Sequence, residues 1–251
     1  PGLPRTIRAV LTPAVVAASE PSTIQCVTED EYGNAIPPDQ FPLVVSHSED
    51  LVLNGLEISG TVTGLYQIKC LPQSEDAAYF EIVRGELTVL PGPPHEMFVV
   101  PLPDKDVYKT YELVDFEISV LDEWGNLIPD PPLTKPVASP TPGIKVINET
   151  TVLLKKEGVF LLNFTLDGMT SPSVELEIVI DGSGPSVVIE QPLRGETRED
   201  KPVINVIGTI TDPFAGIESF LVNDYAVAVD ADGNFTRIVP LHIGMNTVTW
   251  T

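Results

Sequence analysis

The chain has 251 residues, of which 43% are hydrophobic, and this is enough for two or three domains that each bury an apolar core. Its 36 acidic residues against 14 Lys and Arg give a formal net charge of −22, which repels nucleic-acid phosphates and anionic lipid headgroups. We therefore expect no nucleic-acid partner. No direct membrane insertion is expected either, because the sequence lacks an apolar run of about 18 residues.

Proline and glycine divide the sequence into many short segments. The chain has 25 Pro and 18 Gly, and no long stretch repeats apolar residues at the helical spacing. This composition is typical of all-β sandwiches. Because the chain opens at Pro1 without Met or an apolar leader, we also expect a processed product or an excised segment.

An alternating strand followed by the same turn occurs twice. Residues 24–37 alternate polar and apolar side chains into Asp30-Glu-Tyr-Gly-Asn34 and then Ile-Pro, and residues 116–129 do the same around Asp122-Glu-Trp-Gly-Asn126. Gly and Asn tolerate positive φ, and an Asp side chain can bond to nearby backbone, so each segment is predicted to be a tight turn.

A later strand repeats as well. Gly64–Cys70 parallels Gly158–Phe164 in its Gly-x-aromatic start and its alternation. The turns are offset by 92 positions and the later strands by 94. One duplicated domain of roughly 90 residues explains both offsets.

The two cysteines of the chain lie in these repeated strands. Alternation places Cys26 and Cys70 on inward faces, and the second copy has Ile118 and Phe164 at the same positions. We predict a Cys26–Cys70 disulfide across a sandwich core, worth about 4 kcal/mol in the chain-entropy model. It implies a secreted, cell-surface or periplasmic protein, whereas two buried free thiols would fit a cytosolic one.

A third segment follows a Gly/Pro-rich linker at 181–185, and a similar linker lies at 91–94. We therefore predict three tandem Ig-like domains: 1–92 with the disulfide, 93–182 without one, and 183–251, incomplete at its C-terminal end. Strands of the third domain are expected at 187–190, 203–210, 219–222, 226–229, 235–239 and 246–250, with a hairpin turn at Asp230–Asn234.

These residues resemble known families. The Asp-x-x-Gly-Asn turn followed by Gly-x-Tyr or Gly-x-Phe resembles the tandem bacterial Ig-like domains of invasin-type surface proteins, and is similar to filamin repeats. Segments 206–212, 217–223, 229–235 and 241–248 of the third domain look like Ig-like accessory domains of some bacterial glycoside hydrolases and surface proteins. Tyr66 resembles the tyrosine-corner residue of Ig domains, although its distance to Cys70 is four residues rather than two.

The resemblance implies a β-sandwich fold and, for function, a non-catalytic spacer or adhesive segment. An accessory module of a carbohydrate-active enzyme and a filamin-like scaffold are the alternatives. Three domains in line would make an extended rod about 100 Å long, given the rise of about 3.3 Å per residue in a strand. We expect a protein or glycan partner at the cell surface, or neighbouring domains of the same chain.

No catalytic motif is recognised. The chain's three histidines, at positions 47, 95 and 242, are scattered, and neither a nucleophile elbow nor a phosphate loop occurs. No cofactor is expected, with calcium as the one open alternative. Calcium ligands are predicted at the turns and linkers, where hydrogen-bonded turns explain the same carboxylates: Asp30, Asp122, Asp181, Asp212, Asp230 and Asp232. Trp124, at a turn tip, is predicted either to bind a partner or to cap the sandwich end.

Overall fold

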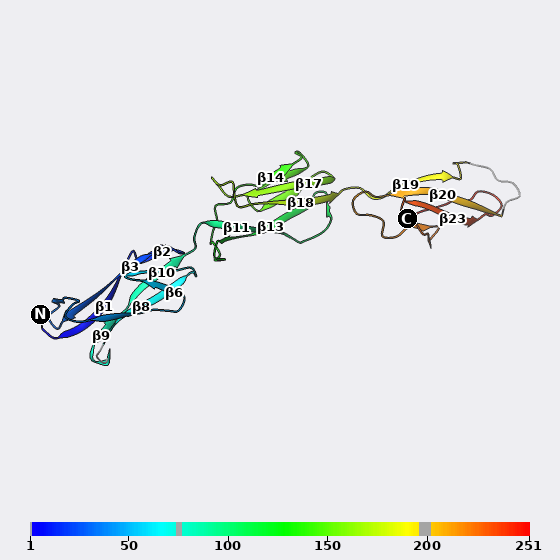
Figure 1. Ribbon diagram of the computed structural model, residues 1–251. Coiled ribbons are helices and arrows are strands. Elements are labelled where there is room, and N and C mark those ends of the chain that lie inside the picture. The colour runs from blue at the N-terminus through cyan, green and yellow to red at the C-terminus, as the bar shows by residue number, and fades with distance from the viewer. Residues whose placement is uncertain (1, 74–76, 196–201) are drawn as a thin grey trace. The chain divides into compact units, whose positions relative to one another are not determined.

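A computed structural model describes residues 2–73, 77–195 and 202–251. Strands make up the regular structure of these ranges, together with a single 3-10 turn at Ala77–Tyr79 (Figure 1). The all-β fold class is therefore confirmed. The described residues include no helix with the length and apolarity to span a membrane.

The first pair of sheets is built from residues 4–90. One sheet has the order β6-β7-β3-β1-β9, with β4 also paired to β3, and the other has the order β2-β10-β8-β5. The strands are β1 Pro4–Thr12, β2 Val15–Ala17, β3 Ser22–Asp30, β4 Ala35–Ile36, β5 Leu43–Ser46, β6 Leu51–Asn54, β7 Glu57–Gly60, β8 Gly64–Pro72, β9 Glu81–Val83 and β10 Gly85–Leu90.

Alternate side chains of these strands fill the core between the two sheets. Ile7 of β1, Ile24 of β3 and Ile68 of β8 are at most 1% exposed and belong to one buried cluster. Each buried side chain of this size contributes roughly 1.5–3 kcal/mol by leaving water. Ile24 and Ile68 lie two residues before Cys26 and Cys70 on the same strands, so these strands bury the faces that alternation predicts.

The second pair of sheets is built from residues 94–181. Its sheets have the orders β11-β13-β16-β15 and β12-β18-β17-β14. The strands are β11 Pro94–Leu102, β12 Tyr108–Lys109, β13 Leu113–Asp122, β14 Val137–Ser139, β15 Ile144–Val146, β16 Thr151–Leu154, β17 Gly158–Thr165 and β18 Ser173–Asp181.

Aromatic rings occupy the core of the second pair. Phe116 of β13 and Phe164 of β17 pack edge to face, with their ring centroids 5.0 Å apart. Phe164 is 1% exposed, and Ile118 is partly buried. The second pair thus places apolar side chains where the first places its two cysteines, as the sequence repeat predicts.

The third group of strands is smaller. A three-stranded sheet has the order β19-β20-β23, and β21 pairs with β22 beside it. The strands are β19 Ser186–Gln191, β20 Val203–Thr211, β21 Leu221–Val222, β22 Tyr225–Ala226 and β23 Asn234–Pro240. Phe220 and Phe235 form the centre of its core, with ring centroids 4.5 Å apart.

Two strands predicted in the third group are not formed as predicted: β22 contains only Ala226 of residues 226–229, and residues 246–250 form no strand. Pairing with β21 is confined to the end of this segment, where Trp250 forms an isolated bridge to Val222 and the Thr249 carbonyl accepts a hydrogen bond from the Asn223 N–H at 2.9 Å. The Asn246 side chain instead accepts a hydrogen bond from the His242 N–H at 2.8 Å and donates one to the His242 carbonyl. Gly244, at φ 106°, lets the chain turn inside this loop.

The compact units defined by close packing do not coincide with the groups of strands defined by sheet pairing. One compact unit comprises residues 1–99, 117–134 and 165–174, and the other comprises 100–116, 135–164 and 175–251. Residues of the second pair of sheets belong to both units. The domain limits 1–92, 93–182 and 183–251 stay a prediction.

Candidate functional site: the disulfide and the aspartate turns

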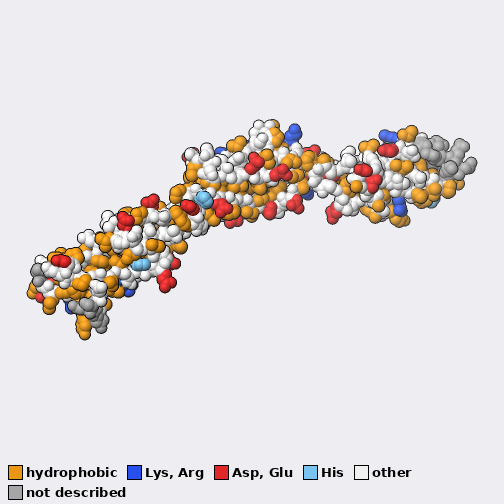
Figure 2. Space-filling model, viewed as in Figure 1, with side chains coloured by type: hydrophobic (Ala, Val, Ile, Leu, Met, Phe, Trp, Pro, Cys, Tyr) orange, Lys and Arg blue, Asp and Glu red, His pale blue; other side chains and the backbone are white. Residues whose placement is uncertain are grey.

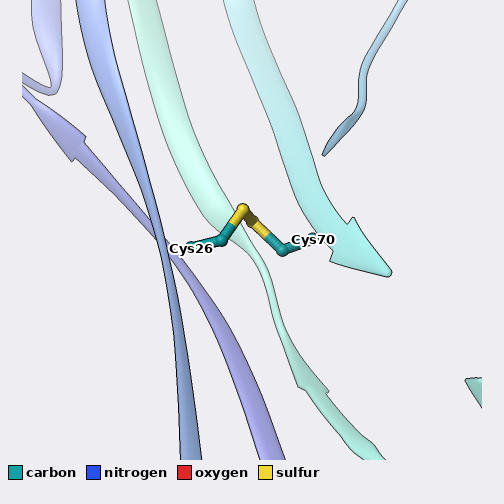
Figure 3. Close-up of a disulfide and its surroundings, with 2 residues drawn as sticks. All are labelled: Cys26 and Cys70. Carbon is teal, nitrogen blue, oxygen red and sulfur yellow. A yellow bond between two sulfur atoms is a disulfide. The ribbon is translucent and has the colours of Figure 1, made fainter. Parts of the chain in front are cut away.

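A disulfide joins the two sheets of the first pair. Cys26 lies on β3 and Cys70 on β8, their Cα atoms are 5.8 Å apart, and their sulfurs are bonded (Figure 3). Strand β3 belongs to one sheet and β8 to the other, so the bond crosses the core. The structure therefore contains the disulfide that the sequence predicts.

The first aspartate turn holds the chain where it leads into β1. Asp30 is 3% exposed, and its Oδ1 accepts hydrogen bonds from the backbone N–H groups of Tyr32 and Asn34, both at 2.9 Å. Its Oδ2 accepts one from the Gly2 N–H at 2.8 Å. Gly33 adopts φ 80° inside the turn. One carboxylate thus closes the turn and holds the backbone that leads into the strand.

The second aspartate turn repeats this arrangement. Asp122 is 2% exposed, and its Oδ1 accepts hydrogen bonds from the N–H groups of Trp124 and Asn126, at 2.9 Å and 2.8 Å. Its Oδ2 accepts a bond from the Gly92 N–H at 2.8 Å. Gly92 precedes β11 as Gly2 precedes β1. Both turns therefore tie the end of an inner strand to the start of their own sheet pair.

Trp124 lies on the same stretch of chain. A Cβ atom added to Gly92 would come within 2.7 Å of Trp124 Cζ3, so the indole packs directly on this glycine. The Trp124 side chain is still 39% exposed. This contact supports the capping alternative for Trp124, while a binding role stays a prediction.

A third turn of the same pattern was predicted only as a hairpin. Asp230 Oδ1 accepts hydrogen bonds from the N–H groups of Asp232 and Asn234, at 3.0 Å and 2.8 Å, and Gly233 adopts φ 83°. The letters Asp-x-x-Gly-Asn were visible in the sequence. This turn leads into β23, whereas the other two follow the long strands β3 and β13.

These bonds lower the pKa of each carboxyl that accepts them. The pKa of Asp30 lies well below its ordinary 3.8, first because the Gly2 N–H donates to it and next because the Asn34 side chain does. For Asp122, burial raises the pKa, but hydrogen bonds led by the Asn126 side chain outweigh burial and the pKa is lowered. The Asn234 side chain is the main cause of the lowered pKa of Asp230.

We therefore expect acid to weaken the first turn. Because the pKa of Asp30 is lower in the folded state than in the unfolded state, its contribution is complete above about pH 4 and is lost as the pH falls further. The melting temperature, followed by circular dichroism from pH 7 to pH 2, should fall most steeply below pH 4. An Asp30→Asn variant should start lower and fall less steeply. Equal slopes in both proteins would contradict this assignment.

Five of the six predicted calcium ligands, all except Asp232, accept hydrogen bonds from backbone N–H groups. Asp181 Oδ1 accepts a hydrogen bond from the Ser183 N–H at 3.1 Å, and Asp212 Oδ1 accepts two from the turn that follows it. Asp212, Asp230 and Asp232 border one open hollow, and Asp181 is not among its lining residues. Within the described ranges, no group of three or more His, Cys, Asp or Glu side chains is arranged to hold a metal ion. Calcium binding stays a prediction.

Acidic side chains mark the visible surface more generally. Figure 2 shows Asp and Glu, in red, spread along the visible face, with few Lys or Arg, in blue. This distribution fits the formal net charge of −22. The charge keeps such chains apart in solution and favours a cationic partner over an anionic one.

A tyrosine corner is present in the first pair of sheets. The Tyr66 hydroxyl donates a hydrogen bond to the Val62 carbonyl at 2.9 Å, four residues upstream, which is the bond that defines this feature in Ig domains. Burial is the main cause of the raised pKa of Tyr66, and the charge of Asp50 adds to it. The different spacing to Cys70 therefore does not prevent the corner from forming.

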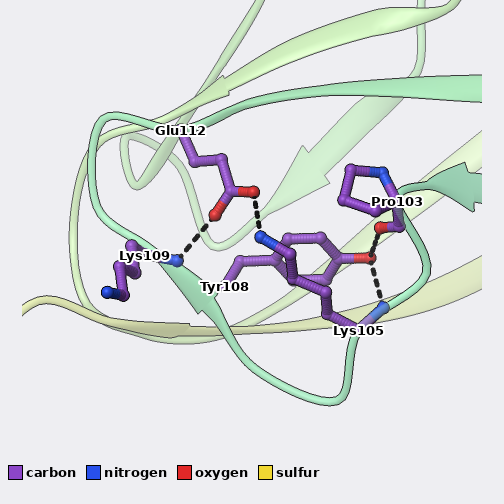
Figure 4. A network of polar contacts seen from close by, with 5 residues as sticks. All are labelled: Pro103, Lys105, Tyr108, Lys109 and Glu112. Carbon is purple, nitrogen blue, oxygen red and sulfur yellow. Dashed lines mark hydrogen bonds and ion pairs between the residues drawn. The ribbon is translucent and has the colours of Figure 1, made fainter.

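Sequence reasoning missed a second tyrosine of this kind (Figure 4). Tyr108 is 2% exposed; its hydroxyl donates to the Pro103 carbonyl at 2.9 Å and accepts from the Lys105 N–H at 3.2 Å. Lys105 lies 5.6 Å from the ring centroid and forms an ion pair with Glu112, which also accepts from the Lys109 N–H. This network anchors the connection between β11 and β13.

Comparison with solved structures identifies the fold. The Escherichia coli adhesin FdeC matches with a TM-score of 0.60 at 16% identity, over 95% of this chain and 90% of that one. The Yersinia pseudotuberculosis protein InvD matches at 0.46 and 12% identity, over 97% and 83% of the chains. The surface-layer protein SbsC, domains 1–6, gives 0.36 and 12%, over 99% and 38%. No protein-family model and no curated protein sequence matches the chain. The likeness to FdeC shows the fold of tandem bacterial Ig-like domains.

Proposed function

We propose that this chain is a non-catalytic segment of a bacterial surface or secreted protein, acting as a spacer that carries an adhesive or protein-binding part. The observation that carries the proposal is the extent of the match to FdeC, an adhesin, which spans 95% of this chain and 90% of that one. The likeness thus extends over nearly the whole chain. A match to a single β-sandwich would carry less weight, because unrelated proteins share that fold.

Two local features support a spacer. The disulfide joins the two sheets of the first pair. The first two aspartate turns hold the backbone that precedes β1 and β11, through hydrogen bonds to Gly2 and Gly92. A linker whose N–H groups are bonded to the domain that it leads into is stiffer than a free Gly/Pro linker. We propose three such domains, 1–92, 93–182 and 183–251, in an extended row.

The proposed setting is extracellular or periplasmic. A Cys26–Cys70 bond forms and persists in an oxidising compartment, and this counts against the filamin-like intracellular scaffold. The second alternative, an accessory module of a carbohydrate-active enzyme, depends on the third domain alone. A glycan array with no bound glycan would count against it. A protein or glycan at the cell surface is the proposed partner.

Small-angle X-ray scattering tests the spacer. A rod about 100 Å long has a radius of gyration of about 30 Å, whereas a compact globule of this chain length has about 18 Å. We expect a value near the first figure, unchanged between low and moderate salt. A value near the second would refute the spacer. A value that rises strongly at low salt would show a chain extended by charge repulsion rather than by fixed joints.

A further inference from the structure

The Asn126 side chain binds a loop of the first pair of sheets as well as its own turn. Asn126 Oδ1 accepts a hydrogen bond from the Thr63 N–H at 3.0 Å, and Asn126 Nδ2 donates one to the Thr61 carbonyl at 2.7 Å. The same Nδ2 also donates to Asp122 Oδ2 at 2.7 Å. An amide side chain offers one acceptor and one donor, so it can pair with a backbone N–H and a backbone carbonyl in the way that a neighbouring strand does.

The corresponding asparagines of the other two turns behave differently. Asn34 Nδ2 donates to both oxygens of Asp30, at 3.2 Å and 3.0 Å. Asn234 Nδ2 donates to both oxygens of Asp230, at 3.2 Å and 3.1 Å. In the second turn, by contrast, the amide of Asn126 is oriented differently. Its Nδ2 donates both to Asp122 and to the Thr61 carbonyl, and its Oδ1 accepts from the Thr63 N–H. The difference between otherwise equal turns indicates that the loop contact orients Asn126.

The loop that Asn126 binds is held from its own side too. Thr61–Thr63 connects β7 of one sheet to β8 of the other, and its middle residue accepts the tyrosine-corner bond from the Tyr66 hydroxyl. The Thr61 carbonyl and the Thr63 N–H, on either side of Val62, bond to Asn126. Residues 1–99 and 117–134 belong to the same compact unit, so close packing groups this loop and this turn together.

We propose that Asn126 is the binding residue of a fixed joint. In this joint the Asp122–Asn126 turn grips the Thr61–Thr63 loop through Asn126 and holds the linker at Gly92 through Asp122 and Trp124. The ligand of the site is thus backbone of the first pair of sheets, recognised by one N–H and one carbonyl. This inference rests on the proposed spacer function, because a spacer requires rigid joints between its domains.

Hydrogen exchange at the Thr63 amide tests the joint in the full chain. In the unaltered protein this N–H should be protected, because it donates to Asn126 Oδ1. In an Asn126→Ala variant its exchange should be roughly tenfold faster, since a bonded amide is returned to water. Asn34→Ala is the matched control: it weakens an equal turn without touching the loop, and should leave Thr63 unchanged.

A second measurement separates the joint from general damage to the turn. Backbone 15N relaxation should give one shared correlation time for residues 1–90 and 94–181 in the unaltered chain. Two separate times are expected for Asn126→Ala. An unprotected Thr63 amide in the unaltered protein, or equal effects of the two alanine variants, would overturn the joint. A compact scattering profile would instead overturn the spacer while leaving Thr63 protection intact.

Discussion

Removal of the Cys26–Cys70 disulfide is expected to lower the free energy of unfolding of the first pair of sheets by about 4 kcal/mol. The bond spans a sequence separation of 44 residues, and the cross-link restricts the unfolded chain more strongly than it changes the folded one. For a domain of this size, the loss corresponds to a fall in melting temperature on the order of 20 °C. Cys26→Ala combined with Cys70→Ala makes the change, and differential scanning calorimetry measures it.

The second pair of sheets supplies the internal control for this experiment. Its core pairs Phe164 with Phe116 and contains no cysteine, so its own transition should keep its temperature. Reductant should lower the transition of the unaltered chain to that of the double variant and should leave the variant unchanged. A single transition that moves as a whole would show instead that the sheet pairs unfold together.

The repeat made the first two sheet pairs predictable from sequence. Alternation predicts the inward faces, and the presence of Ile118 and Phe164 at the positions of the two cysteines indicates which strands the disulfide joins. Such predictions succeed because every second side chain of a half-buried strand is apolar, and this alternation can be recognised in the amino-acid sequence. They describe what each sheet pair buries within itself.

The contacts around the aspartate turns were beyond this kind of reasoning. Gly92 binds Asp122 through its backbone N–H, and Thr63 binds Asn126 in the same way. Every residue except proline carries that donor, so the sequence gives no sign of which one is used. The strand predicted at 246–250 is wrong for a related reason: the Asn246 side chain bonds to His242 within its own loop, and pairing with β21 begins only at Thr249.

The second turn should be far more sensitive than the third to loss of its aspartate, because Asp122 is buried and Asp230 is exposed. In an Asp122→Ala variant, the N–H groups of Gly92, Trp124 and Asn126 lose a shared acceptor at a site that is 2% exposed. Buried donors left without a partner cost about 1–3 kcal/mol each, and part of this cost is recovered when water enters. We expect a loss of roughly 2–4 kcal/mol, and a fall in the melting temperature of the second transition on the order of 10–20 °C.

Asp230→Ala is the matched control for this variant. Its carboxylate makes the same bonds within its turn, to the N–H groups of Asp232 and Asn234, but it is exposed to solvent. Water can replace an exposed acceptor at little cost, so the third transition should move far less. Equal falls in melting temperature for the two variants would mean that the bonds within the turn, rather than the buried hydrogen bond to Gly92, account for the stabilisation. An unchanged Asp122→Ala protein would remove the basis for treating the second turn as the point where the linker is held.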